Sequence, residues 1–148
     1  MGIKFFFNNI DKKILGTQRD LKRFITQLFI AEGVEPYDLN YIFCSDEYLL
    51  HINLTFLAHN YFTDIITFDL SDEFNKRLGE IYISVDRVLE NSIKWKSSYQ
   101  QELYRVIFHG VLHLCGYKDK SVKQKAAMRY LENKYLSSYT SFVSRGTY

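Results

Sequence analysis

The sequence predicts an α+β fold, a single domain in which a mixed four-stranded sheet is packed with helices. The length of 148 residues suits one domain, and no repeat or Pro/Gly-rich linker divides it. Four short stretches are rich in β-branched and aromatic residues, as strands are. Other stretches carry apolar residues at helical spacing. The last two strands are joined by the short polar link DEFNKR, so we expect them to pair antiparallel.

The elements are expected in the order β-α-β-α-β-β-α-α-α. The predicted strands span 2–9, 39–45, 64–71 and 78–86. The predicted helices run from about 17 to 33, 46 to 56, 86 to 96, 98 to 115 and 121 to 136. Their expected N-terminal caps are Thr17, Asp46, Asp86, Ser98 and Ser121. We take 1–148 as one domain and expect the polar tail 137–148 to be frayed.

Composition excludes several classes of protein. No apolar run approaches the roughly 20 residues of a membrane helix, and the N-terminus does not resemble a secretory signal. Cys44 and Cys115 are too few for a disulfide framework and fit a reducing, cytoplasmic location. The net charge is only +2, so a surface that binds nucleic acid must be local.

The stretch FHGVLHLCGYKDK (108–120) carries the clearest chemical signal. His109 and His113 are four residues apart on a predicted helix, so both imidazoles can reach one metal ion. Gly116 allows a left-handed turn that brings Asp119 back as a third ligand. Two histidines hydrogen-bonded at the edge of the core are the alternative, but the turn and the carboxylate favour a metal. We expect Cys115 to be a small core residue rather than a ligand.

Gly110 occupies the position where metalloproteases of the H-E-x-x-H type carry their catalytic glutamate. A peptidase is therefore a disfavoured function for this chain. The glycine has two interpretations, which the sequence leaves open. It either leaves space above the helix for a bulky substrate or allows close packing against the sheet.

The same stretch resembles the signature H-G-x-L-H-L-x-G-Y-D-H of the YbeY family of metal-dependent endoribonucleases. The matching residues are His109, Gly110, Leu112, His113, Leu114, Gly116 and Tyr117. The segment NLTFLAHNYFTDIITF (53–68) is similar to a second family block, in which Asn53, Thr63, Asp64 and Phe68 match. LGEIYIS (78–84) resembles the family's Leu-Gly-Asp-Ile strand.

This resemblance implies an α+β sandwich with a zincin-like H-x-x-x-H helix and a zinc ion at the mouth of a cleft beside the sheet. It further implies a hydrolase specific for single-stranded RNA. Such an enzyme would act with the ribosome on the 3′ end of small-subunit ribosomal RNA, so RNA and the ribosome are the expected partners.

The sequence departs from the family pattern at two positions. Asp119 stands where the family has its third histidine, which gives a His-His-Asp site for one divalent ion. Zinc fits such a site, and so do Mn, Ni and Fe. Leu57 stands where the family carries an arginine. His59 either takes over part of the role of that arginine or is a solvated loop residue.

Basic residues are concentrated just after the motif. They are Lys118, Lys120, Lys123, Lys125, Arg129 and Lys134. We expect His59 and Lys118 to assist catalysis, and Lys120, Lys123, Lys125 and Arg129 to bind RNA. A solvated helix face is the alternative. Tyr61, Phe62 and Tyr117 either stack on unpaired bases or belong to the core.

Two functions other than an endoribonuclease stay open. One is an RNA-binding ribosome-assembly protein with weak catalysis, and the other is a hydrolase of another substrate.

Overall fold

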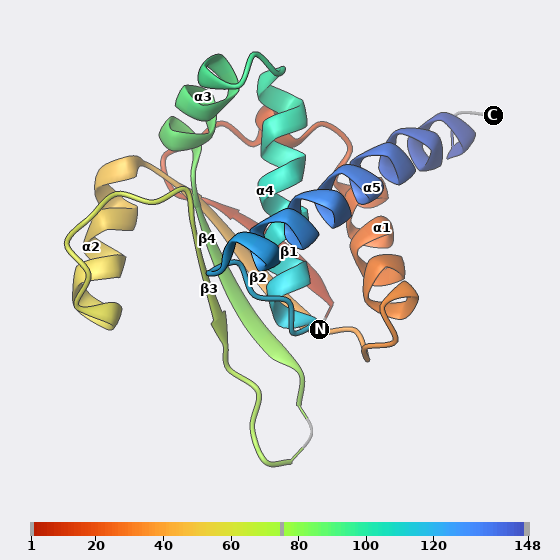
Figure 1. Cartoon of the computed structure of the whole chain (residues 1–148), viewed down its shortest axis with the longest axis horizontal. Coiled ribbons are helices and arrows are strands. Elements are labelled where there is room, and N and C mark those ends of the chain that lie inside the picture. Colours follow the sequence, from red (N-terminus) through yellow and green to blue (C-terminus); the bar gives the residue numbers. More distant parts are fainter. Residues whose placement is uncertain (1, 75, 147–148) are drawn as a thin grey trace.

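The four strands form one mixed sheet in a computed structural model that describes residues 2–74 and 76–146 (Figure 1). They are β1 (Ile3–Phe7), β2 (Asp38–Cys44), β3 (Ile65–Asp69) and β4 (Leu78–Ser84), arranged in the order β1-β2-β4-β3. β2 pairs in parallel with both β1 and β4. β3 and β4 pair antiparallel, so the predicted α+β fold with a mixed four-stranded sheet is confirmed.

The helices are α1 (Gln18–Ala31), α2 (Asp46–Leu57), α3 (Val85–Lys94), α4 (Tyr99–Leu114) and α5 (Val122–Gly146). One further turn, the 3-10 helix η1 (Lys12–Leu15), had no counterpart in the sequence-based prediction. Within the described ranges, no helix combines the length and the apolar character needed to cross a membrane.

Serine residues cap four of the helices. The hydroxyl groups of Ser45, Ser84, Ser98 and Ser121 each accept the backbone N–H of the residue three positions further along the chain. Ser98 is the predicted cap of α4. The predictions of Asp46 and Asp86 as caps are wrong by one and by two residues, because Ser45 and Ser84 have the extended backbone of a cap. The two aspartates instead occupy the first turn, where a negative charge is favourable.

The last helix is longer than predicted. α5 continues to Gly146, through most of the segment 137–148 that we expected to be frayed, and residues 147 and 148 lie outside the described part of the chain. The cause is aromatic packing between α5 and α1. The ring centroid of Tyr139 lies 5.0 Å from that of Phe24, and the ring of Phe142 lies 5.5 Å from it. These contacts continue the core along a helix whose sequence reads as polar.

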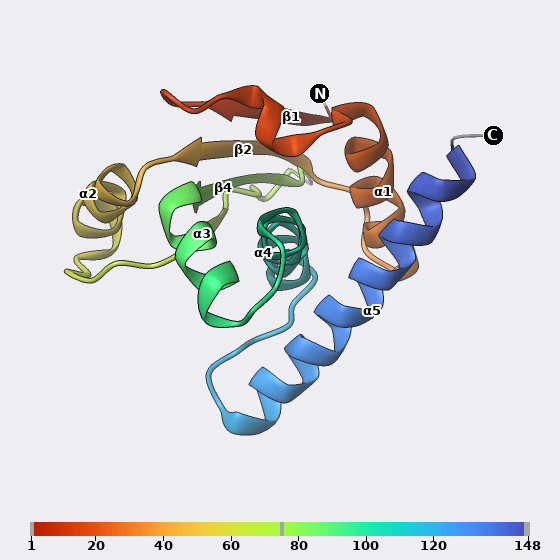
Figure 2. The same ribbon diagram turned by 90° about the horizontal axis from the view of Figure 1, so that it is seen from above.

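The two faces of strands β3 and β4 contact different helices. Ile65 and Ile81 point to the face covered by α4, whereas Ile66 belongs to the cluster buried beneath α2. In Figure 1 these strands accordingly lie between α2 and α4. Figure 2 shows α4 below the sheet, between α3 and α5. The C-terminal end of α2 is therefore separated from α4 by the sheet.

Gly110 is the point at which α4 approaches the sheet. A Cβ atom at this position would lie 2.9 Å from Ile81 Cδ1 and 3.1 Å from Ile65 Cδ1. Those separations are too short for an alanine without movement of the neighbours. The close-packing interpretation of Gly110 is confirmed, and the glycine does not open space for a substrate.

Candidate metal centre

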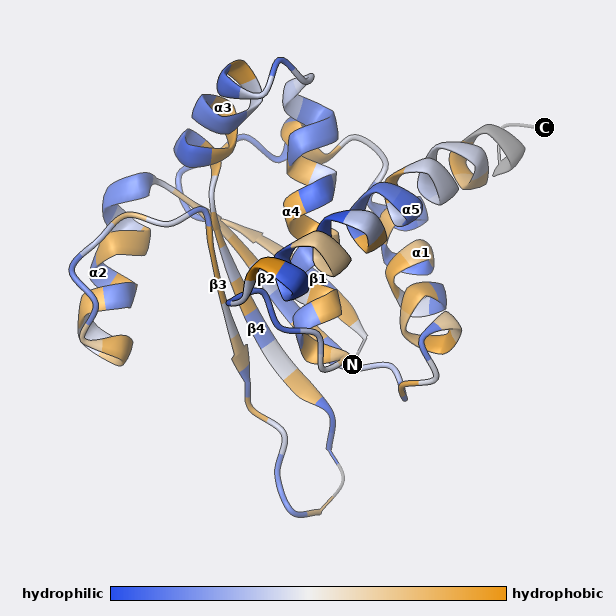
Figure 3. Ribbon diagram, viewed as in Figure 1, coloured by the Kyte–Doolittle hydropathy of each residue, from blue (hydrophilic) through white to orange (hydrophobic). Residues whose placement is uncertain are grey.

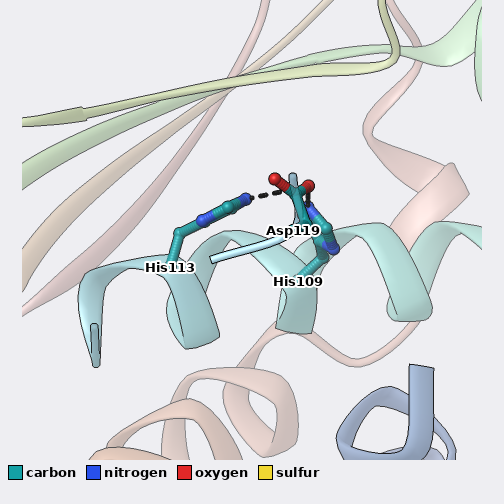
Figure 4. A group of neighbouring side chains, drawn as sticks. All are labelled: His109, His113 and Asp119. Carbon is teal, nitrogen blue, oxygen red and sulfur yellow. Dashed lines mark hydrogen bonds and ion pairs between the residues drawn. The ribbon is translucent and has the colours of Figure 1, made fainter. Parts of the chain in front are cut away.

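Three side chains converge beside the C-terminal half of α4. His109 and His113 project from successive turns of the helix, and Asp119 returns from the loop that follows it (Figure 4). Asp119 Oδ2 lies 3.2 Å from His109 Nε2 and 3.3 Å from His113 Nε2. Gly116, with a φ of 103°, makes the left-handed turn that lets the chain double back. The sequence-predicted triad is therefore brought together.

The other nitrogen of each imidazole already has a partner. His109 Nδ1 lies 2.6 Å from Glu132 Oε2, and His113 Nδ1 lies 2.9 Å from the carbonyl oxygen of Tyr117. Both partners are acceptors, so each Nδ1 carries a hydrogen and donates it. In the neutral ring the lone pair is then on Nε2, which faces Asp119. Partners of this kind orient the histidine ligands of metal sites.

The spacing of the three groups fits a metal ion. Their ligand atoms all lie within 4.8 Å of one another. Ligands about 2.1 Å from a tetrahedral ion are about 3.4 Å apart, close to the separations from Asp119 Oδ2. His109, His113 and Asp119 would hold the ion and leave at least one coordination position for a water molecule or a substrate oxygen.

A buried ionic cluster lies on the Nδ1 side of His109 and holds its partner Glu132 in place. Arg105 Nη1 donates to Glu132 Oε1 over 2.8 Å, and Arg105 Nε donates to Glu102 Oε1 over 3.0 Å. Arg105 Nη2 donates to the second oxygen of Glu102. Only 3% of each glutamate side chain is exposed, compared with 13% of the arginine. Glu132 is thus fixed between Arg105 and His109 by charge-assisted hydrogen bonds.

The cluster shifts the pKa values of its members. Burial lowers the pKa of His109, but the hydrogen bond and the charge of Glu132 outweigh burial, so that the pKa is raised overall. Burial raises the pKa of Glu132, but the hydrogen bond from His109 and the charge of Arg105 outweigh it, so that the pKa is lowered overall. Both shifts favour an imidazolium–carboxylate pair in the metal-free protein.

The triad lies in a cleft of about 490 Å³ between α4 and the edge strand β3. The side of the cleft opposite the helix is formed by residues of and before β3. They are Thr63, Asp64, Ile65, Thr67 and Asp69. Burial raises the pKa of Asp64, although His109 and Arg105 act in the opposite direction. The cleft therefore holds a carboxyl group that protonates more readily than usual close to the three candidate ligands.

The predicted RNA-binding residues are exposed in the loop around Asp119 and at the start of α5. Lys118 and Lys120 are exposed on either side of Asp119, and Lys123, Lys125 and Arg129 are exposed on the first turns of α5. Figure 3 shows a hydrophilic band at the start of this helix. Arg129 Nη1 also lies 3.7 Å from Glu132 Oε1.

The residues at the end of α2 lie elsewhere. Neither Leu57 nor His59 is among the residues that line the cleft. Leu57 is the last residue of α2 and is 39% exposed. The exposed ring of His59 stacks on Tyr61, whose hydroxyl lies 2.9 Å from His59 Nδ1. The structure therefore does not bring His59 to the triad.

The three aromatic candidates for base stacking separate into two groups. Tyr61 and Phe62 are 56% and 49% exposed, on the loop that leads into the cleft at Thr63. Tyr117 instead packs against the main core and donates a 2.6 Å hydrogen bond to Glu32 Oε1. Tyr61 and Phe62 have free ring surface, whereas Tyr117 has a structural role.

Sequence reasoning missed two residues that shape the site, Arg105 and Glu132. A signal for Glu132 was present. It is a lone acid on the buried side of α5, with the buried Met128 four residues before it and the buried Tyr135 three residues after it. A carboxylate on an apolar stripe indicates a buried partner. For Arg105 the signal is its position one turn before His109 on α4.

These features define a class of protein: an α+β domain with a candidate three-ligand metal centre beside the free edge of a sheet. Comparisons with known proteins agree on one family. The endoribonuclease YbeY family matches residues 6–140. Endoribonuclease YbeY of Cytophaga hutchinsonii is 46% identical over 133 residues, which cover 90% of this chain and 93% of the relative. The Porphyromonas gingivalis W83 protein of the same name is 47% identical over 121 residues, covering 78% and 80%.

A solved structure agrees with these relatives. The solution structure of TM1509 from Thermotoga maritima superposes with a TM-score of 0.67 at 26% identity, covering 97% of this chain and 93% of that one. The chain belongs to the endoribonuclease YbeY family. The resemblance predicted from the helix motif is confirmed.

Proposed function

We propose that this protein is a metal-dependent endoribonuclease that cleaves single-stranded RNA in ribosomal RNA processing. Membership of the endoribonuclease YbeY family supports the reaction. The observation that carries the metal dependence is the convergence of two Nε2 atoms on Asp119 Oδ2 at 3.2 and 3.3 Å. The family resemblance supports the 3′ end of small-subunit RNA as the substrate and the ribosome as the partner.

Zinc is the ion that we propose for the site, since two imidazoles and a carboxylate at tetrahedral spacing suit it. When bound, such an ion supplies an activated water molecule and polarises a phosphate oxygen. Hydrolysis forms a bond from the water oxygen to phosphorus and breaks a P–O ester bond, and the departing oxygen takes up a proton. Asp64, whose pKa burial raises, is placed in the cleft to give that proton.

The basic surface after the motif suits a nucleic-acid substrate. We propose that Lys120, Lys123, Lys125 and Arg129 guide the RNA backbone, and that Lys118 stabilises negative charge near Asp119. The exposure of all five side chains at the start of α5 and in the preceding loop supports this assignment. His59 is proposed only as a contact to RNA outside the cleft, because it does not line the cleft.

We place the enzyme in the cytoplasm. Both cysteines are free thiols, as expected in a reducing compartment. Burial, the largest effect, raises the pKa of Cys44 and of Cys115 to about 12, so neither is a reactive thiolate.

The test is an RNA cleavage assay with zinc-reconstituted protein on a single-stranded oligonucleotide and on its duplex. We expect cleavage of the single strand, loss of cleavage with a chelator, and recovery on adding zinc. His113→Ala, reconstituted in the same way, should be inactive. RNA binding without cleavage by fully metal-loaded protein would instead favour the alternative of an assembly protein with weak catalysis.

A further inference from the structure

Arg105 belongs to the same row of side chains as the two histidines. Arg105, His109 and His113 are spaced four residues apart on α4, so they lie one above the other on successive turns and all three line the cleft. Three of the five N–H groups of the guanidinium are used by Glu102 and Glu132. The two glutamate side chains are 3% exposed and do not line the cleft, whereas the arginine side chain is 13% exposed and lines it. The cation is therefore the part of this cluster that faces the cleft.

Across the cleft, the hydroxyl group of Thr67 lacks a partner. Thr67 Oγ1 is buried and makes no hydrogen bond within the part of the chain that the structure describes. Leaving a buried hydroxyl unpaired costs about 1–3 kcal/mol, so such groups are rare without a functional reason. Thr67 lies on β3 and lines the same cleft as Arg105 and the triad.

We propose that Arg105 and Thr67 form a phosphate-binding subsite beside the metal centre and hold the non-bridging oxygens of the RNA phosphate that is cleaved. This inference rests on the proposed function and adds two catalytic residues to it. Arg105 donates its two unused N–H groups from the helix side, and Thr67 donates its hydroxyl hydrogen from the strand side. Both kinds of donor stabilise the negative charge that grows on the phosphate oxygens.

In this subsite Arg105 supplies the positive charge that the arginine expected at position 57 would have provided. Leu57 lies at the end of α2, and the residues that line the cleft include Arg105 but not Leu57. Two further carboxylates, those of Asp69 and Asp119, line the cleft as well. A phosphate group would be repelled by them, so a bound metal ion and a cleft-facing cation are both needed for it to enter.

Thr67→Val is the most discriminating variant, because it removes the hydroxyl and keeps the shape of the side chain. A purely structural threonine would lose stability on this change, whereas an unpaired buried hydroxyl would not. Ser97→Ala is the matched control. Ser97 Oγ is the other buried hydroxyl without a partner among the described residues, and it does not line the cleft. Arg105→Lys keeps the charge and removes the planar fork.

The measurements are the melting temperature, zinc content, RNA cleavage and the calorimetric affinity of zinc-loaded protein for inorganic phosphate. We expect Thr67→Val to melt no lower than the wild type, to bind zinc fully, and to lose about 10²-fold in kcat. We expect phosphate affinity to fall at least about 10-fold in Thr67→Val and in Arg105→Lys, and to stay unchanged in Ser97→Ala. Unchanged phosphate affinity in a folded, zinc-loaded Thr67→Val protein would overturn the subsite. The calorimetric result decides this even if the wild type cleaves no RNA, so failure of the proposed function is distinguished from failure of the subsite.

Discussion

His109 Nδ1 lies 2.6 Å from Glu132 Oε2, across a helix–helix contact that joins residues 23 positions apart. Glu132 is 2% exposed and is held in place by Arg105. The carboxylate therefore decides which nitrogen of His109 faces Asp119. This relationship links the geometry of the candidate metal centre to the docking of α5 on α4.

Replacing Glu132 should weaken the metal centre without removing a ligand. We expect Glu132→Gln to lower zinc affinity by about 10- to 100-fold, because the amide orients the imidazole less firmly and makes it a weaker base. The affinity should be measured by competition with a chromophoric chelator, well above the pKa of His109. Glu73→Gln, at an exposed acid between β3 and β4, is the control. Equal affinities in Glu132→Gln and the wild type would show that Glu132 only pairs with Arg105.

Zinc binding should depend on pH in a defined direction. The raised pKa of His109 means that the metal-free imidazole keeps its proton to higher pH than a free histidine does. Zinc must displace that proton, so affinity should rise with pH below this pKa and level off above it. Calorimetry in buffers of different ionisation enthalpy should detect proton release near neutral pH, and less release in Glu132→Gln. Affinity that does not change across the pH range would contradict the ion pair.

The element order could be predicted because each strand and helix has its own local signal. The caps at Ser45 and Ser84 were misplaced because an aspartate follows one residue after Ser45 and two residues after Ser84, and both residue types are good caps. The length of α5 was underestimated for another reason. Tyr139 and Phe142 are stabilised by Phe24 in α1, and this tertiary contact leaves no periodic signal within the segment itself.

The candidate ligands could be predicted for a similar reason. His109, His113 and Asp119 lie within one helix turn and one loop, so their convergence follows from local geometry. Arg105 and Glu132 meet only through the packing of two helices. Thr67 comes to the cleft through sheet topology, since the edge position of β3 depends on the strand order. Sequence spacing does not encode either relationship.

Close packing at Gly110 predicts a loss of stability on substitution. Overpacking in Gly110→Ala should cost about 1–3 kcal/mol, and the better helix propensity of alanine should return up to about 1 kcal/mol. We expect a net loss of about 1 kcal/mol in urea denaturation. Ile81→Val removes the atom nearest to the new methyl group, 2.9 Å away, and should reduce the loss in the double mutant. Additive effects of the two changes would refute a direct contact.

Charge reversal on α5 should weaken RNA binding in a salt-dependent way. If Lys123 and Lys125 each contact one phosphate, the double change to glutamate should lower the slope of log affinity against log salt by about 1.4 for single-stranded RNA. The same change at Lys12 and Lys13, which are exposed on η1, alters net charge equally and is the control. Equal slopes for the two double mutants would show that net charge, and not the α5 surface, governs binding.

The measurement that tests the central claim most directly is the zinc affinity of Asp119→Ala, taken together with its melting temperature in the metal-free state. Ser121 and Gln124 already cap α5 through reciprocal hydrogen bonds of 3.1 Å, so Asp119 is not needed to start the helix. Its carboxylate faces both imidazoles instead. We predict that zinc affinity falls by more than about 100-fold, which is more than the loss of a hydrogen-bond partner of a metal ligand costs. The melting temperature of the metal-free protein should stay close to that of the wild type. Zinc affinity equal to that of the wild type, with a lower melting temperature, would contradict the His109–His113–Asp119 metal centre.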